Sequence, residues 1–145
     1  MTNLEIVYLI TICVLIICTI TDGCSFEIWI PVVLCPIPLM LFLLYTGGEE
    51  IGKSILAGTV ITGCFLLLSF ATGGQIGKGD CLLLGVSAIG MEWWQIMSVL
   101  FVSFLFAGIF GSLLILIRKK SRKYKIPFAP FVMVGYVLTL GSSYL

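Results

Sequence analysis

Long apolar stretches alternate with short polar or glycine-rich breaks along the whole chain. A helix that crosses the hydrocarbon of a bilayer needs roughly 20 residues, with about 17 as a lower limit. Five of the six stretches reach this length, and the fourth is shorter. The pattern predicts an all-α, polytopic membrane helical bundle of about six transmembrane helices, forming one membrane-embedded domain over residues 1–145. The expected spans are residues 4–21, 28–45, 53–72, 80–92, 94–117 and 126–145.

The second expected span contains three prolines, Pro31, Pro36 and Pro38. Proline lacks a backbone donor and clashes with the preceding turn, so a helix that contains it bends or breaks. We therefore expect this span to be irregular. Such a helix could open a path for water into the membrane, or it could be a simple kink.

The composition indicates that lipid is the solvent of this chain. The sequence is 60% hydrophobic and 10% charged, with a mean hydropathy of +1.21. A soluble domain carries roughly a quarter of its residues as Asp, Glu, Lys and Arg, and a small chain cannot enclose so much apolar surface in one core. The expected partner of the protein surface is a lipid bilayer, with no nucleic-acid partner, and the sequence leaves a homo-oligomer open.

The cysteines raise the question of a metal site. The six cysteines include no C-x-x-C pair, and the chain has no histidine. A zinc site needs closely spaced Cys or His ligands, whereas cysteine inside an apolar run behaves as a small hydrophobic residue. We expect no metal site and no cofactor. The cysteines are Cys13, Cys18, Cys24, Cys35, Cys64 and Cys81.

The positions of the basic residues predict how the spans are oriented. Seven of the eight Lys and Arg residues are Lys78 or belong to the run Arg118–Lys125. Basic residues favour the cytoplasmic side, so the loop after the fifth span is expected inside. Counting back through the spans places Lys78 inside too, and both termini outside with Glu50, Lys53 and Glu92. A re-entrant fourth segment would separate Lys78 from the basic run, so the charges favour six crossings.

The chain contains only two aspartates, Asp22 and Asp80. Asp22 closes the first span and Asp80 opens the fourth, so both are expected at the cytoplasmic ends of their helices. Ionisable groups at membrane depth are costly and usually face a bundle interior or a water-filled cavity. Two neighbouring carboxyls share one proton. The ionised partner can then deprotonate a water while the protonated one polarises a scissile carbonyl, which predicts a catalytic pair for peptide hydrolysis.

Other interpretations of the same residues remain open. Without histidine, neither a Ser–His nor a Cys–His site is available, and a serine–lysine dyad is poorly placed because nearly all lysines lie in one loop. The aspartates could instead form the proton relay of a small proton-coupled transporter, or the chain could be a non-catalytic assembly subunit. The glycines at 73, 74, 77 and 79 could let an extended substrate approach the backbone, or they could form a plain flexible loop.

Three elements resemble the type IV prepilin and archaeal preflagellin peptidases. Residues 77–80 read Gly-Lys-Gly-Asp, which fits the G-x-G-D signature of intramembrane aspartic proteases, and a glycine-rich stretch precedes them. Asp22 followed by Ile30 and Pro31 is similar to the family's first catalytic element. Residues 126–131 read Ile-Pro-Phe-Ala-Pro-Phe after the basic loop, which resembles the family's C-terminal Ile-Pro-Phe-x-Pro-Phe.

The resemblance implies an aspartic endopeptidase of the cytoplasmic membrane with Asp22 and Asp80 as catalytic residues. Its implied partners are prepilin-like membrane-anchored precursors, such as pilins and pseudopilins of type IV pilus and secretion systems. It would cleave their short basic leader on the N-terminal side of a hydrophobic helix, at the cytoplasmic face. Larger bacterial members carry a methyltransferase insertion with paired C-x-x-C motifs. No such motif occurs in this sequence, so the resemblance implies the short form.

Overall fold

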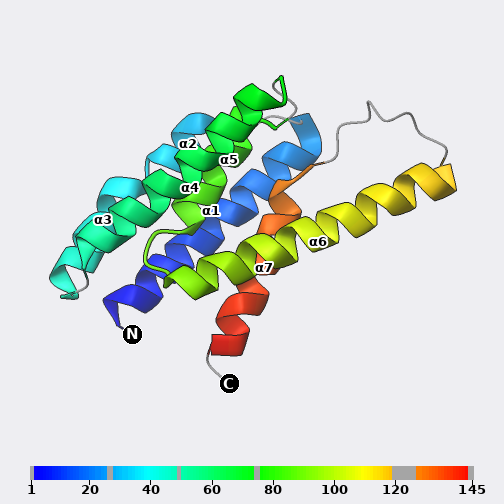
Figure 1. The fold of residues 1–145 in the computed structure, drawn as a ribbon. Coiled ribbons are helices and arrows are strands. Elements are labelled where there is room, and N and C mark those ends of the chain that lie inside the picture. The colour runs from blue at the N-terminus through cyan, green and yellow to red at the C-terminus, as the bar shows by residue number, and fades with distance from the viewer. Residues whose placement is uncertain (1, 26–27, 49, 74–75, 119–126, 144–145) are drawn as a thin grey trace.

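The chain folds into a bundle of α-helices (Figure 1). The computed structural model describes residues 2–25, 28–48, 50–73, 76–118 and 127–143, and these ranges contain no strand. The predicted all-α fold is confirmed. The helices are α1 (Asn3–Ser25), α2 (Ile30–Leu34), α3 (Ile37–Thr46), α4 (Ile51–Ala71), α5 (Lys78–Ser87), α6 (Trp93–Arg118) and α7 (Ala129–Ser143).

Three of these helices are long and apolar enough to cross a membrane: Asn3–Cys24 within α1, Ile51–Ala71, and Trp93–Leu114 within α6. Two further apolar segments, Ile30–Thr46 and Ala129–Ser143, are shorter. Together with α5, these helices account for the six apolar stretches of the sequence. They form the membrane bundle that the hydropathy pattern predicts.

The second apolar segment is interrupted, as its prolines predict. A turn at Cys35 and Pro36 separates α2 from α3. Pro31 and Pro38 each lie in the first turn of their own helix, where a missing N–H costs nothing because that donor has no partner inside the helix. The prolines therefore divide one span into two short helices.

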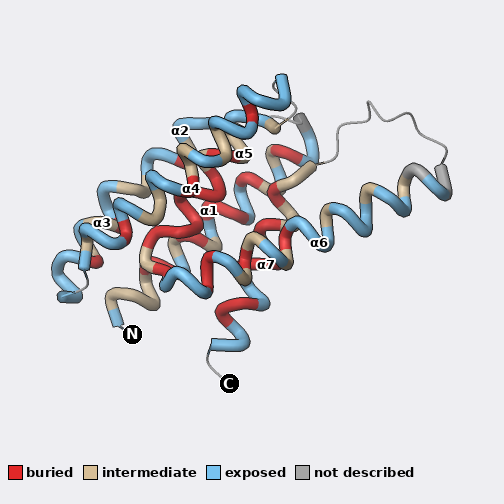
Figure 2. The backbone as a smooth tube through the Cα atoms, in the orientation of Figure 1, coloured by how far each residue is buried: buried red, intermediate tan, exposed pale blue. Residues whose placement is uncertain are grey.

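Helix α5 differs from the expected fourth span in length and surroundings. It has ten residues, which corresponds to about 15 Å at 1.5 Å per residue, against a hydrocarbon core of about 30 Å. It packs against α1, α2, α4 and α7. Every residue from Cys81 to Ser87 except Leu82 is buried. The apolar side chains of α5 are thus covered mainly by protein, and Figure 2 shows buried backbone running through the middle of the bundle.

Small residues allow the closest helix contacts. A Cβ atom on Gly85 of α5 would lie 2.9 Å from the carbonyl oxygen of Gly58 on α4. On α7, a Cβ atom on Gly135 would lie 2.9 Å from the carbonyl oxygen of Val99 on α6. Membrane helices approach closely where side chains are small, so these two glycines set the spacing of the α4–α5 and α6–α7 pairs.

Polar contacts show which helix ends lie together. Asn3 Nδ2 donates to Thr46 Oγ1 at 3.0 Å, which joins the start of α1 to the end of α3. Tyr8 Oη donates to the carbonyl oxygen of Gly90, and Gln95 Nε2 on α6 donates to Ser143 Oγ at the end of α7. The helices therefore alternate in direction as the charge pattern predicts, and both chain ends lie at the bottom of Figure 1. We call this the terminal end of the bundle.

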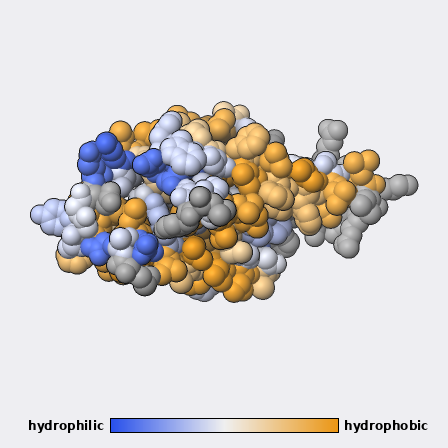
Figure 3. Space-filling view, turned by 90° about the horizontal axis from the view of Figure 1, so that it is seen from below, coloured by the Kyte–Doolittle hydropathy of each residue, from blue (hydrophilic) through white to orange (hydrophobic). Residues whose placement is uncertain are grey.

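The outer surface is largely apolar along α6 and more hydrophilic at the terminal end (Figure 3). In the far half of α6 most of the large side chains are exposed, including Phe106, Ile109 and Leu116. An exposed apolar surface of this extent is stable against lipid tails and not against water. The protein is accordingly a membrane protein.

Candidate active site

Asp22 lies in the last turn of α1 and is only 6% exposed. Its Oδ2 atom accepts a hydrogen bond from the backbone N–H of Ala129 at 3.1 Å. Ala129 is the first residue of α7 and is fully buried. A helix begins at this point because Pro130 follows, and proline favours the first turn, where its fixed φ suits the helix. The carboxyl of Asp22 thus faces the N-terminal end of a second helix.

Asp80 lies in the first turn of α5 and is partly buried. Its carboxyl folds back onto Gly77, the residue that precedes the helix: a Cβ atom on Gly77 would lie 2.9 Å from Asp80 Oδ2. Any other residue at position 77 would push the carboxyl away. An acidic side chain in the first turn is also stabilised by the helix dipole.

Gly79 brings the chain that follows Asp22 against the helix that carries Asp80. A Cβ atom on Gly79 would lie 2.7 Å from the Cβ atom of Ile28, which is closer than side chains pack. Ile28 lies just before α2. The two glycines of the G-x-G-D sequence therefore have separate roles, one at the Asp80 carboxyl and one at the contact with Ile28. Lys78 between them is exposed.

The fold brings the two aspartates together. They lie at the end of the bundle opposite the chain termini, where the end of α1 and the start of α7 meet in Figure 1. Helices α1 and α5 are packed against each other, and Gly79, the residue before Asp80, lies against Ile28, six residues after Asp22. We call this the aspartate end of the bundle. Two like charges held close in a poorly hydrated site cannot both ionise freely.

Cations do not compensate these carboxyls in the described part of the chain. There the only ion pair joins Lys53 and Glu50, at the terminal end. No group of three His, Cys, Asp or Glu side chains gathers in the described residues. The basic run was predicted to lie on the same side as the aspartates, but its residues 119–125 lie outside the described ranges.

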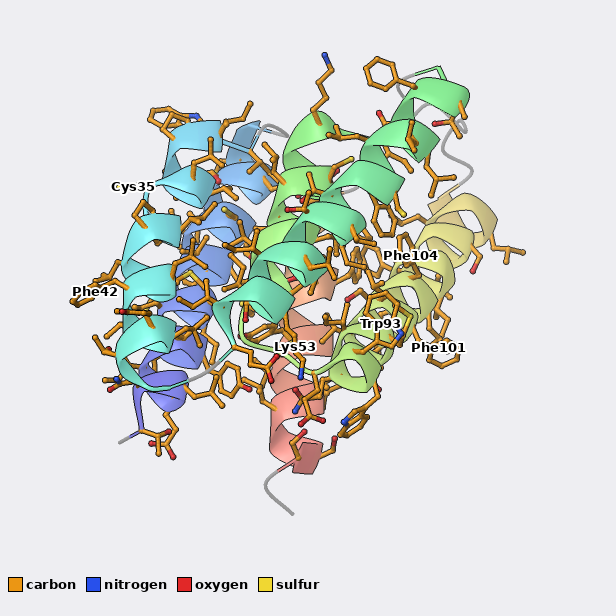
Figure 4. All side chains as sticks on the ribbon, turned by 60° about the vertical axis from the view of Figure 1, so that its left-hand side comes forward. Cys35, Phe42, Lys53, Trp93, Phe101 and Phe104 are labelled. Atoms are coloured by element: carbon orange, nitrogen blue, oxygen red, sulfur yellow. The ribbon has the colours of Figure 1, made fainter. Side chains whose placement is uncertain are left out.

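Aromatic rings hold the start of α7 beside Asp22. The ring of Phe128 lies 5.3 Å from that of Phe104 on α6, which in turn stacks on Phe65 of α4 at 5.6 Å. Phe131 contacts Phe110 of α6 at 5.5 Å. In Figure 4, Phe104 lies between α6 and the rest of the bundle, whereas Phe101 points outward. The two phenylalanines of Pro-Phe-x-Pro-Phe therefore anchor α7 to α6.

The sequence singled out both aspartates as candidates and did not indicate the groups that contact them. The Ala129 N–H is a backbone donor and has no side-chain signature. Ser69 is also buried, and its hydroxyl donates to the carbonyl oxygen of Ile76 at 2.6 Å, which ties the end of α4 to the segment before Gly77. For the start of α7, the one sequence signal was the Pro-Phe-x-Pro-Phe pattern at residues 127–131.

Comparison with known proteins identifies the family. A family model of the type IV leader peptidases matches residues 9–112, which include Asp22, Asp80, most of α1 and all of α5. No curated protein and no solved structure matches the chain. The match covers well over half of the sequence and agrees with the resemblance seen in its motifs. The chain therefore belongs to the type IV leader peptidase family.

Proposed function

We propose that this membrane peptidase is an aspartic endopeptidase in which Asp22 and Asp80 form the catalytic pair. The observation that carries the proposal is the meeting of two carboxyls, 58 positions apart in the sequence (80 − 22), at one end of the bundle. Family membership supports peptide hydrolysis. Among the described residues, Asp22 is the only buried acidic side chain, and Asp80 at the same end of the bundle is partly buried.

The chemistry follows from the shared proton. With one carboxyl ionised and the other protonated, the ionised group accepts a proton from water as the water oxygen attacks the scissile carbonyl carbon. The protonated group donates a hydrogen bond to the carbonyl oxygen, which gains negative charge. Collapse of the intermediate breaks the C–N bond, and the leaving amine takes a proton from the pair. The two carboxyls exchange roles and no cofactor is consumed.

The proposed substrate is a prepilin-like precursor with a short basic leader and a hydrophobic helix. A substrate helix anchored in the bilayer would present its leader at the depth of the aspartate end. Gly77 is exposed beside Asp80, and a residue without a side chain there would let the leader approach the aspartates. We place this end at the cytoplasmic face of the cell membrane, because Lys78 lies there and basic residues favour that side.

Co-expression with a prepilin-like substrate tests the proposal. Asp22→Asn and Asp80→Asn keep the side-chain shape but remove the titrating group, so each should abolish conversion of precursor to mature protein. Glu92→Gln removes a carboxyl at the terminal end and should leave conversion intact. All three variants should accumulate in membranes like the wild type. Full cleavage by either asparagine variant would refute the proposal, and proteoliposome proton flux lost on the same substitution would favour a transporter.

A further inference from the structure

The start of α7 lies outside the range that the family model matches, yet it touches Asp22. Ala129 is fully buried, Asp22 is 6% exposed, and 3.1 Å separate the Ala129 nitrogen from Asp22 Oδ2. A buried carboxylate without a donor costs several kcal/mol. A backbone N–H at a helix N-terminus offers such a donor together with the positive end of the helix dipole.

The local sequence leaves this donor aimed at Asp22. Pro130 has no N–H, so it cannot compete for the carboxyl in the first turn of α7. Phe128 and Phe131 fix the turn through their ring contacts with Phe104 and Phe110 on α6. The position of the Ala129 N–H therefore depends on how α7 packs against α6, and not on a titratable side chain of α7.

We propose that the backbone N–H of Ala129 is a positioning group for Asp22. It holds the Oδ2 atom in place, so that the carboxyl keeps one orientation toward the reacting groups. The ionisable side chains that interact with Asp22 are Asp80 from α5 and Cys18 from its own helix. This inference rests on the proposed function, since it assigns a role within the aspartate pair.

Ala129→Pro removes the donor at a helix position where proline is tolerated, and its ring also adds atoms to a fully buried site. A hydrogen bond to a charged group contributes about 1.5–3 kcal/mol. We therefore expect kcat to fall about ten- to hundredfold, with KM nearly unchanged. The acidic midpoint of the pH–activity profile should move to higher pH, because a hydrogen bond to a carboxylate is lost.

Two control variants separate positioning from folding. Ala129→Gly keeps the N–H and should keep the wild-type pH midpoint. Ile51→Pro makes the same change at the first position of α4, at the terminal end, where Glu50 already has the extended conformation that precedes proline. It should leave both kcat and the pH midpoint unchanged. Each rate is divided by the amount of folded protein in the membrane.

The outcomes are distinct. A rate reduced at an unchanged pH midpoint in Ala129→Pro would reflect folding alone and would overturn the inference, as would a wild-type rate. If Ala129→Pro does not accumulate in the membrane, Phe128→Leu replaces it as the test, because this variant loosens the ring contact with Phe104. The midpoint of its pH–activity profile should rise by a smaller amount. An unchanged midpoint would overturn the inference. Retained cleavage in Asp22→Asn would instead refute the proposed function itself.

Discussion

The two ends of the bundle hold charge in opposite ways. At the terminal end, Lys53 and Glu50 form an ion pair of 3.1 Å, with side chains 78% and 70% exposed. At the aspartate end, Asp22 is 6% exposed and faces a second carboxyl of the same sign. Water and an opposite charge stabilise the first pair, while backbone groups support the second. Costly burial of ionisable groups is concentrated at functional sites, whereas a solvated pair at the surface requires no such explanation.

Substitution of Gly79 is expected to have the largest effect on stability and cleavage. Gly79→Ala would place a Cβ atom 2.7 Å from the Cβ of Ile28, and overpacking of this kind costs about 1–3 kcal/mol. Cleavage should fall at least about tenfold, because Asp80 moves with its helix. Gly52→Ala in α4 meets no atom within 4 Å and should be neutral or slightly stabilising. Thermal unfolding and substrate conversion of the two variants test this, and equal effects would contradict it.

Loss of one buried hydroxyl should have the next largest effect. Ser69→Ala removes the donor to the Ile76 carbonyl oxygen and should destabilise the protein by about 1–2 kcal/mol, with a several-fold loss of cleavage. Ser112→Ala removes an exposed hydroxyl that bonds only within α6, to the Ile109 carbonyl. Its stability should change by less than about 0.5 kcal/mol. Denaturation in detergent measures both, and an inert Ser69→Ala would show that the tie to the loop is unimportant.

Neutralising one aspartate should raise the stability of the protein. Asp80→Asn removes the cost of burying a carboxylate and also its repulsion with Asp22, so the free energy of unfolding of this variant should rise by about 1 kcal/mol. The gain should vanish below about pH 4, where carboxyls of the wild type also become protonated. Glu92→Gln at the terminal end should show no such gain. A destabilised Asp80→Asn would mean that the charge of Asp80 supports the fold.

The smallest effect is expected at the exposed ion pair. Lys53→Met should change stability by less than about 1 kcal/mol, because solvent and salt screen exposed pairs. Cleavage should stay at the wild-type rate, since Lys53 lies at the far end from the aspartates. Unfolding at low and high salt measures the effect. A loss of activity in this variant would contradict the functional separation of the two ends.

Some of these features were predictable from the sequence because they depend on local pattern. Hydropathy located the apolar segments, the prolines marked the break between α2 and α3, and the alternation of spans put Asp22 and Asp80 at one end. Each inference needed only the order of residues along the chain. The sidedness of that end, which rests on the basic residues, stays a prediction.

Other features depend on contacts between distant segments and escaped prediction. Helix α5 is short and is covered by four other helices. Hydropathy could not reveal this, because it does not distinguish protein from lipid as the apolar neighbour of a segment. The contact of Gly79 with Ile28 joins the first turn of α5 to the segment before α2. The donor at Ala129 is a backbone group, so no residue type announces it.

Cross-linking tests whether Asp22 and Asp80 lie close together. In a background with the six native cysteines replaced by alanine or serine, Asp22→Cys and Asp80→Cys are combined and treated in native membranes with a short thiol-specific cross-linker. An internal cross-link between positions 22 and 80 is expected. No cross-link is expected when Asp22→Cys is combined with Glu92→Cys at the terminal end. Absence of the first link, or equal yields for the two pairs, would contradict the proximity of Asp22 and Asp80.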